Sequence, residues 1–235
     1  MRITLILTSA IKPSHKTPYL RHFDEKLRLK ETLICLKKWK RIVEKNDFRC
    51  ILVDNTLNQK ELRSKFSAVK FPNLRLIAAP SITDNDLKRG AGYCELKSLK
   101  YAISRLDLSN ESLIIKCNAR YFIRNFENLF RFVNQINKIY FMTYLRIDRA
   151  ETKFFIITLK HLREFLEYAE SRVNLQFNLE HSFAKYIYLN AYHESISLPI
   201  EPVIFGVSGH SGRRYKFFNE AWAKNKINVL YQNFG

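Results

Sequence analysis

The sequence lacks the features that define several large classes of protein. No apolar run approaches the roughly 20 residues that a transmembrane helix needs, and the four cysteines form no CxxC pair or zinc-type spacing. Six glycines and six prolines in 235 residues leave no material for a collagen-like repeat or a long flexible linker. The apolar stretch 3–7 is short and is expected to form a buried strand, not an export signal. We therefore expect a folded cytosolic protein with reduced cysteines.

Acidic side chains are scarce relative to basic ones. The chain has 22 Asp and Glu against 40 Lys and Arg, which gives a formal net charge of +18. This excess favours anionic partners, such as nucleotide phosphates, nucleic acid or an acidic membrane face. Hydrophobic residues make up 46% of the chain, which excludes a disordered protein and allows a single large domain.

Strand-like and helix-like segments alternate through the first half of the chain. The β-rich runs are 2–8, 49–53, 74–78 and 113–117, and the clearest helical stripes are 28–45 and 96–106. This alternation predicts an α/β fold with a mostly parallel central sheet flanked by helices. In such sheets the ligand lies outside the carboxyl ends of the strands. We therefore expect the residues at or just after the ends of the first three runs to point toward one crevice, namely Thr8, Ser9, Asp54, Pro80 and Ser81. Asn118, directly after the fourth run, is expected near the same crevice.

Four segments, LILTSAI, ILVDNT, GAGYCELKSLKYAI and ESLIIKCNARY, follow one another as in the nucleotide-sugar-binding half of a GT-A-type glycosyltransferase. The resemblance is one of pattern and covers about half of the chain. It implies a GT-A-like (Rossmann-like) single domain, 1–235, with a C-terminal elaboration. Residues 1–121 would bind the nucleotide-sugar donor, with Asp54 contacting the nucleoside, and residues 122–235 would form the acceptor side.

The same resemblance implies an activity and a location. The expected enzyme moves a sugar to a lipid-linked or oligosaccharide acceptor in the synthesis of bacterial surface polysaccharide, such as capsule, lipopolysaccharide or exopolysaccharide. It would work in the cytoplasm, peripherally bound to the inner face of the plasma membrane.

The sequence departs from the family at the end of the fourth strand-like run. The family usually has Asp-x-Asp there, which holds a divalent cation against the diphosphate, whereas residues 116–121 read Lys-Cys-Asn-Ala-Arg-Tyr. We predict that Lys116 and Arg120 neutralise the diphosphate directly, with Asn118 and Tyr121 beside the donor. No metal or other cofactor is therefore expected. The alternative for Lys116 is a strand-end lysine that reaches solvent.

An Asp-x-Asp does occur earlier in the chain, at Asp84 and Asp86. We interpret it as a solvated acidic loop, because it precedes the family's metal position. Its two carboxylates are the candidate ligands in case the reaction needs a metal.

Three further residues are candidates for contact with the sugars. Gly92, together with Gly90, is predicted to permit a tight turn close to the ligand. Glu95 is predicted to hydrogen-bond a sugar hydroxyl, or else to stabilise a helix start. Glu180, beside His181, is the candidate base that takes the acceptor proton in an inverting reaction. The alternative is a surface pair on an amphipathic helix, and a retaining enzyme would need no such base.

The segment 206–215 contains three of the six glycines together with a histidine and two arginines. In the family a C-terminal loop often closes over the diphosphate, so Gly209, His210, Ser211 and Arg213 are predicted to contact the donor. A basic flexible tail is the alternative.

Basic and aromatic residues alternate towards the end of the chain, in 213–226. This pattern favours an anionic membrane surface over nucleic acid, for which no recognition motif is present. The rival function is a non-catalytic basic module for nucleic acid or another anionic polymer. Such a module would spread its lysines over an open face.

Overall fold

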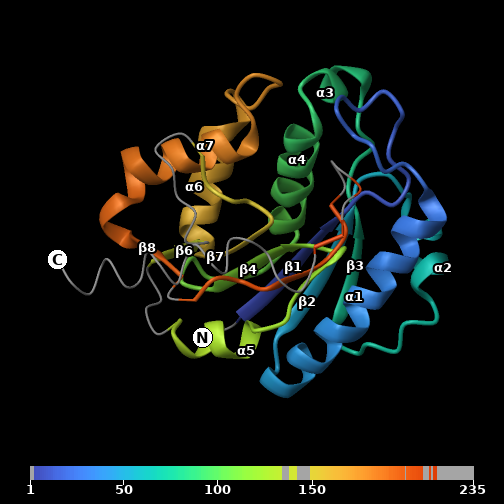
Figure 1. Cartoon of the computed structure of the whole chain (residues 1–235), viewed down its shortest axis with the longest axis horizontal. Helices are drawn as coiled ribbons and strands as arrows, with labels where there is room; N and C mark the ends of the chain where they lie inside the picture. The colour runs from blue at the N-terminus through green and yellow to red at the C-terminus, as the bar shows by residue number, and fades with distance from the viewer. Residues whose placement is uncertain are drawn as a thin grey trace.

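The structure is a computed structural model that describes residues 3–133, 138–141, 149–198, 200–208, 212 and 214–215 (Figure 1). The basic and aromatic segment beyond residue 215, with its expected membrane contact, lies outside the described residues.

A central sheet of seven strands crosses the described part of the molecule in the order β3-β2-β1-β4-β7-β6-β8. The strands are β1 (Ile3–Ser9), β2 (Arg49–Asp54), β3 (Leu74–Ala78), β4 (Leu113–Asn118), β6 (Ile139–Phe141), β7 (Phe154–Thr158) and β8 (Ser195–Ser197). Strands β1 to β4 are parallel, and β7 is antiparallel to its neighbours β4 and β6. A small second sheet pairs β5 (Tyr121–Ile123) with β9 (Ile204–Gly206).

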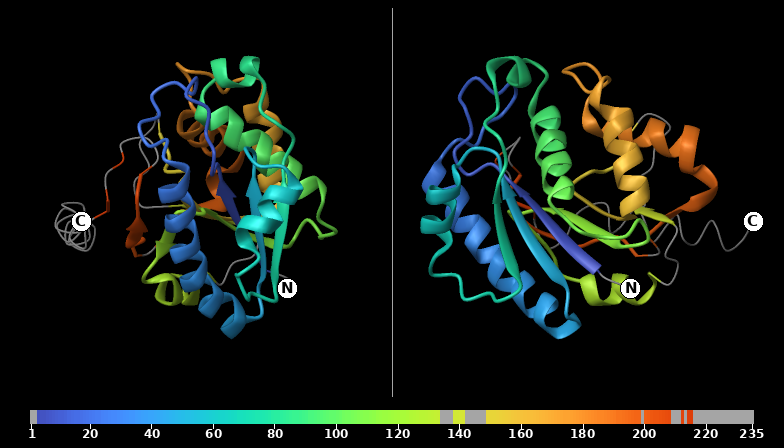
Figure 2. Two further views of the ribbon diagram at one scale, coloured as in Figure 1. Left: turned by 90° about the vertical axis from the view of Figure 1, so that its right-hand side faces the viewer. Right: turned by 180° about the vertical axis from the view of Figure 1, so that it is seen from behind.

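Helices cover both faces of the central sheet (Figures 1 and 2). One face carries α1 (Glu25–Asn46), α2 (Gln59–Phe66) and α5 (Phe126–Arg131), and the other carries α4 (Ala91–Ser104), α6 (Leu159–Glu170) and α7 (Leu179–Tyr186). The short α3 (Asp84–Lys88) precedes α4, and the turns η1 (Ile187–Ala191) and η2 (Tyr192–Glu194) follow α7. None of the described helices combines the length and apolar character needed to cross a membrane. The predicted helix-flanked, mostly parallel sheet is confirmed.

Residues of β1, β2, β4 and β7 are buried on both faces of the sheet, which explains why parallel strands such as β1, β2 and β4 read as continuously apolar runs. Along β1, Leu5 and Leu7 pack in the core under α1, whereas Ile6 packs in the core under α4. Trp39 anchors α1, because its buried indole Nε1 donates a 2.8 Å hydrogen bond to the carbonyl oxygen of Tyr121 and its ring packs edge-on against Phe126. This bond ties α1 to the chain that leaves β4.

The outer edge of the sheet at β3 is closed by a side chain. The Gln59 amide donates to the carbonyl oxygen of Leu76 at 3.2 Å and accepts from the backbone N–H of Ala78 at 3.0 Å. A pocket of about 530 Å³ lies along this edge, lined in part by Arg63 and Arg75. A paired and positively charged edge discourages another strand from adding to the sheet.

Replacing Trp39 tests the anchor. We expect Trp39→Ala to lower the free energy of unfolding by about 3–5 kcal/mol, since it opens a cavity and leaves the Tyr121 carbonyl without its donor. Urea denaturation measures the difference. As a control, Leu189→Ala, at a side chain that is 65% exposed, should change stability by no more than about 0.5 kcal/mol. A loss below about 1 kcal/mol for Trp39→Ala would contradict the assignment.

Candidate functional site

The carboxyl ends of β1, β2 and β4 bring the polar strand-end residues together. In the sheet register Thr8 lies beside Asn118, and Ser9 lies beside Asp54. The chain moves from β1 outward to β3 and then returns to β4 on the other side of β1, so the topological switch point lies between β1 and β4. Asp54 and Asn118 therefore lie at the same edge of the sheet, at the carboxyl ends of the strands on either side of β1, as predicted.

Lys116 lies at the centre of this site and is fully buried. Its Nζ is 2.5 Å from Oε1 of Glu95, and it donates 2.6 Å hydrogen bonds to Oδ1 of Asn118 and to the carbonyl oxygen of Thr152. These contacts use all three donors of the ammonium group. Direct contact between Lys116 and a diphosphate is therefore wrong, and so is the alternative of a solvent-exposed lysine. The side chain points into the α4 side of the sheet, where its charge is neutralised by Glu95.

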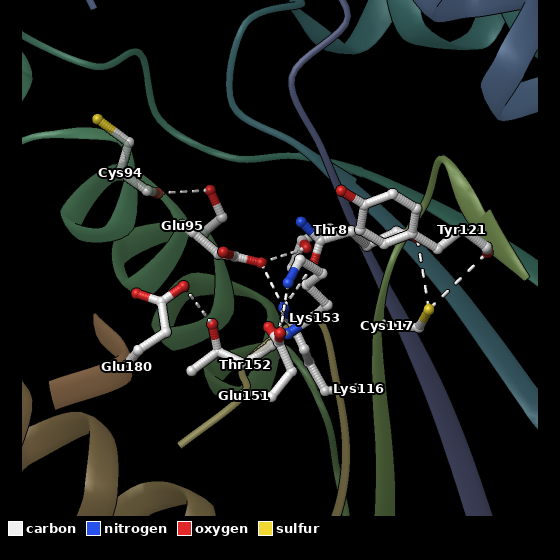
Figure 3. Close-up of polar contacts among 12 residues, drawn as sticks. Thr8, Cys94, Glu95, Lys116, Cys117, Tyr121, Glu151, Thr152, Lys153 and Glu180 are labelled. Carbon is white, nitrogen blue, oxygen red and sulfur yellow. Dashed lines mark hydrogen bonds and ion pairs between the residues drawn. The ribbon is translucent and has the colours of Figure 1, made fainter. Parts of the chain in front are cut away.

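Glu95 is the carboxylate that this arrangement presents (Figure 3). It lies in the second turn of α4, and its side chain keeps 19% of its surface exposed. One oxygen, Oε1, accepts a 2.7 Å hydrogen bond from the hydroxyl of Thr8 as well as the ion pair with Lys116. Oε2 accepts no hydrogen bond from the described residues. Glu95 is thus a fixed carboxylate with one available oxygen, and Thr8, itself buried, acts by holding it.

Glu180 joins the same network through Thr152 (Figure 3). It lies at the start of α7, where Asn178 caps the helix, and its carboxylate accepts a 3.2 Å hydrogen bond from the hydroxyl of Thr152. The carbonyl of Thr152 in turn binds Lys116. A continuous line of polar contacts therefore runs from Glu180 through Thr152 and Lys116 to Glu95.

Asp54 has a structural role that differs from its predicted one. The carboxylate is fully buried and accepts hydrogen bonds from Ser9 Oγ at 2.5 Å and from the backbone N–H groups of Ile11, Thr56 and Leu57. The predicted contact with a nucleoside is wrong, because no surface of Asp54 is left for a ligand. Asp54 organises the loops that follow β1 and β2, and the hydroxyl group of Ser9 donates its hydrogen bond to this carboxylate.

Gly92 also departs from its predicted role. It lies inside α4 and not in a turn, and a Cβ there would lie 3.1 Å from the Cβ of Leu179. The missing side chain lets α7 approach α4 closely, which places the neighbouring Glu180. The tight turn lies at Gly90, which directly precedes α4 and has a φ of 93°.

Arg120 lies in a second, mostly cationic cluster at the same edge of the sheet. Its Nη1 donates to the carbonyl oxygen of Val207 at 3.2 Å and lies 3.6 Å from the Glu31 carboxylate. The nearby Arg28 guanidinium is buried, and its donors reach the carbonyls of Ala10 and His22. Burial and the positive charge of Arg120 lower the pKa of Arg28 to about 9. The negative charges of Asp54 and Glu31 act in the opposite direction but do not outweigh these effects.

Tyr121 is buried and serves the adjoining segment. Burial raises the pKa of its phenol well above the usual value, and its hydroxyl is hydrogen-bonded to Tyr215 and Ser208. The predicted donor contact of Tyr121 is therefore not available. Gly206 fits beneath it with a φ of 138°, where a Cβ would lie only 2.1 Å from the carbonyl oxygen of Arg120. The predicted donor contacts Gly209, His210, Ser211 and Arg213 lie outside the described residues.

Several residues of the site carried no signal in the sequence. Glu151 and Lys153 form an ion pair on either side of Thr152, just before β7. Burial acts to lower the pKa of Lys153, but Glu151 and Tyr215 outweigh it and raise the pKa above its usual value. These residues reach the crevice because β7 pairs with β4, and no local pattern announces that long-range pairing.

The expectation of a solvated acidic loop holds for only one carboxylate of the earlier Asp-x-Asp. Asp84 is exposed and pairs with Lys16 at the surface. Asp86 is buried in the first turn of α3, where it forms the helix cap with Thr83. Burial acts to raise the pKa of Asp86, but hydrogen bonds from Lys97 and Thr83 lower it below its usual value. Within the described ranges no three His, Cys, Asp or Glu residues are grouped as a metal site would require.

Comparisons with known proteins establish the fold. No protein-family model and no curated protein sequence matches the chain. The solved galactosyltransferase LgtC, in complex with donor and acceptor sugar analogs, is similar with a TM-score of 0.50 and 10% identity over 84% of this chain and 73% of LgtC. S. aureus TarS 1–349 in complex with UDP has a TM-score of 0.53 and 13% identity, over 88% of this chain and 61% of TarS.

The chain accordingly has an α/β, GT-A-like fold. The same fold occurs in a Bacillus anthracis protein assigned as a glucose-1-phosphate thymidylyltransferase, with a TM-score of 0.53 and 8% identity over 90% of this chain and 92% of that protein. Likeness at these identities concerns the fold alone, so the activity has to be argued from the site.

A double-mutant cycle tests the central ion pair. Lys116→Met should lower the free energy of unfolding by about 3 kcal/mol, because it leaves Glu95 and two other acceptors without their donor. Adding Glu95→Gln should recover part of that loss, with a coupling of about 1–3 kcal/mol in urea denaturation. As a control, Lys100→Met removes the surface pair between Lys100 and Glu170, whose side chains are each 44% exposed. Lys100 lies on α4, as Glu95 does, and its replacement should lower the free energy of unfolding by at most about 1 kcal/mol. Additive losses would show that Lys116 and Glu95 do not interact.

Proposed function

We propose that the chain is a glycosyltransferase that uses a nucleotide-sugar donor. The observation that carries the proposal is Glu95, a fixed and partly exposed carboxylate at the switch point between β1 and β4. Ligands of open α/β sheets bind at this point, and a carboxylate with one available oxygen suits a sugar hydroxyl. The named neighbours that bind sugars or UDP share this fold, which supports the same class of donor.

The diphosphate of the donor would bind at the cationic cluster. Arg120 keeps 9% of its side-chain surface exposed and would make the contact, and the buried Arg28 beside it would add positive charge against the nearby carboxylates of Glu31 and Asp54. An anion relieves the repulsion between two buried guanidinium groups, and Arg offers a planar fork that matches phosphate oxygens. In this proposal the chain's own charge does the work of a divalent cation, so that no metal is needed.

Glu180 is proposed as the base that takes the proton from the acceptor hydroxyl. Its carboxylate is partly exposed at the start of α7 and is held by Thr152. Residues 1–121 would supply the donor side and the rest of the chain the acceptor side. The proposed acceptor is an oligosaccharide or lipid-linked glycan of bacterial surface polysaccharide, used at the inner face of the plasma membrane.

The deciding experiment follows products from a panel of nucleotide-sugars with and without glycan acceptors. We expect release of the nucleoside diphosphate and a rise in melting temperature when that nucleotide is added alone. Release of pyrophosphate from a nucleoside triphosphate and a sugar phosphate would replace the proposal with nucleotidyl transfer. Tight, salt-sensitive binding of nucleic acid without any turnover would replace it with a polymer-binding module.

Metal removal and Arg120 test the electrostatics of the donor site. Turnover should survive EDTA, and Arg120→Ala should lower the rate about 10²–10³-fold, the effect of losing one preorganised electrostatic contact. Arg105→Ala is the control, because it removes the same charge from an exposed residue at the end of α4, near the β3 edge of the sheet. This variant should retain activity. Activity that vanishes with EDTA and returns with Mn²⁺, or that is unchanged in Arg120→Ala, would contradict metal-independent binding.

Two isosteric variants separate the carboxylates. Glu180→Gln should lower kcat about 10²–10⁴-fold and remove the acidic limb of the pH–rate profile, since the amide cannot accept a proton. Glu95→Gln should instead raise KM for the donor sugar, because it keeps the shape but weakens the hydrogen bond. Melting temperatures of both variants distinguish lost function from lost folding. A normal kcat in Glu180→Gln would assign the base elsewhere or indicate a retaining reaction.

A further inference from the structure

The outer face of α1 carries an unusual set of exposed side chains. Counting 100° per residue, its exposed basic and apolar residues fall within about 120° of the helix circumference. They are Lys26, Leu27, Lys30, Ile34, Lys37, Lys38, Arg41 and Lys45. We call this set the α1 outer face. It lies on the outside of the molecule, on the side of the sheet away from α4 and α6 (Figures 1 and 2).

Most cations of the α1 outer face have no anionic partner within the described residues. Lys45 pairs with Glu127 and Lys38 stands over the rings of Phe122 and Phe205, whereas the remaining four basic residues form no ion pair there. Only one acidic residue of α1, Glu44, is exposed, and it lies 3.6 Å from Nζ of Lys40. The face therefore presents a line of uncompensated positive charge.

The charge is concentrated on this side of the molecule. Helix α1 contains eight Lys and Arg against three Glu, whereas residues 149–198, which include α6 and α7, contain six basic and six acidic residues. Lysines spread uniformly over the surface for solubility would give both regions a similar excess of basic over acidic residues. A one-sided charge instead orients the molecule towards an anionic surface.

Two exposed aliphatic side chains decide what kind of surface fits. Leu27 and Ile34 are each 39% exposed and lie among the lysines, one helical turn from Lys30 on either side. The phosphate backbone of nucleic acid gives aliphatic side chains no apolar surface to contact. At a bilayer interface, such side chains are buried between the lipid headgroups. We propose that the α1 outer face binds the surface of an anionic lipid bilayer, with the helix lying parallel to the membrane plane.

The position of α1 relative to the crevice fits this orientation. Its first turns lie at the carboxyl end of β1, where Nε of Arg28 donates to the carbonyl oxygen of Ala10 at 2.6 Å. Binding through α1 would hold that edge of the sheet near the lipid surface, where a lipid-linked substrate would be found. The proposal itself concerns binding and does not depend on the proposed activity.

Sedimentation with vesicles tests the proposal on the full chain. We expect binding to phosphatidylcholine vesicles containing 30 mol% phosphatidylglycerol, weak binding to pure phosphatidylcholine, and steep loss with added salt. Lys30→Glu/Lys37→Glu should lower the partition coefficient by roughly thirty-fold or more, the effect of losing two basic contacts with an anionic surface. Leu27→Ser/Ile34→Ser should weaken binding while leaving the net charge unchanged.

A matched double variant controls for net charge. Lys160→Glu and Lys185→Glu make the same change in charge at exposed positions on α6 and α7, and should leave vesicle binding within about two-fold of the unmodified chain. Equal losses in the two charge-reversed variants would overturn the proposal in favour of a non-specific net-charge effect. Unchanged binding in the α1 variant would assign membrane contact to another segment, and loss of binding to a DNA oligonucleotide but not to vesicles would make the face a nucleic-acid surface. Circular dichroism and melting temperature confirm that each variant is folded.

Discussion

The buried ammonium group of Lys116 is the constraint on which the site depends. A charge taken out of water must be neutralised and hydrogen-bonded, and the three acceptors that do this come from three separate parts of the chain. Glu95 comes from α4, Asn118 from the end of β4 and the Thr152 carbonyl from the segment before β7. One buried lysine thus fixes the positions of the groups that surround the crevice, and it does so without touching a ligand.

The polar residues at the carboxyl edge divide into two kinds. Asp54, Thr8 and Lys116 are buried and spend their hydrogen-bonding capacity on the chain itself. Glu95 and Glu180 are held by such neighbours yet keep part of their surface exposed. The buried kind gives the site rigidity, and the partly exposed kind is available for chemistry. Hydrogen bonds and ion pairs from rigid neighbours position a carboxylate accurately enough to act on a substrate.

Positive charge has two different meanings in this molecule. Arg28 and Arg120 are buried close together, and burial together with the positive charge of Arg120 lowers the pKa of Arg28. Most basic residues of the α1 outer face are instead exposed and form no ion pair within the described part of the chain, so they act over distance on charged surfaces. The net charge of +18 therefore includes a buried arginine pair, which we propose as the anion site, and exposed basic residues on one face of α1.

The sequence alone determined the first four strands of the sheet, their alternation with helices, and the kind of residue at the end of each of these strands. The β-rich runs and the helical stripes are local patterns of the sequence. The run 74–78, for example, predicts β3 with its observed bounds. Burial and pairing were decided only by the tertiary structure. Whether Lys116 reaches a ligand or a carboxylate depends on α4, β4 and the segment before β7 meeting in space. The sequence shows a lysine at a strand end, but its environment is created by contacts between residues that are far apart along the chain.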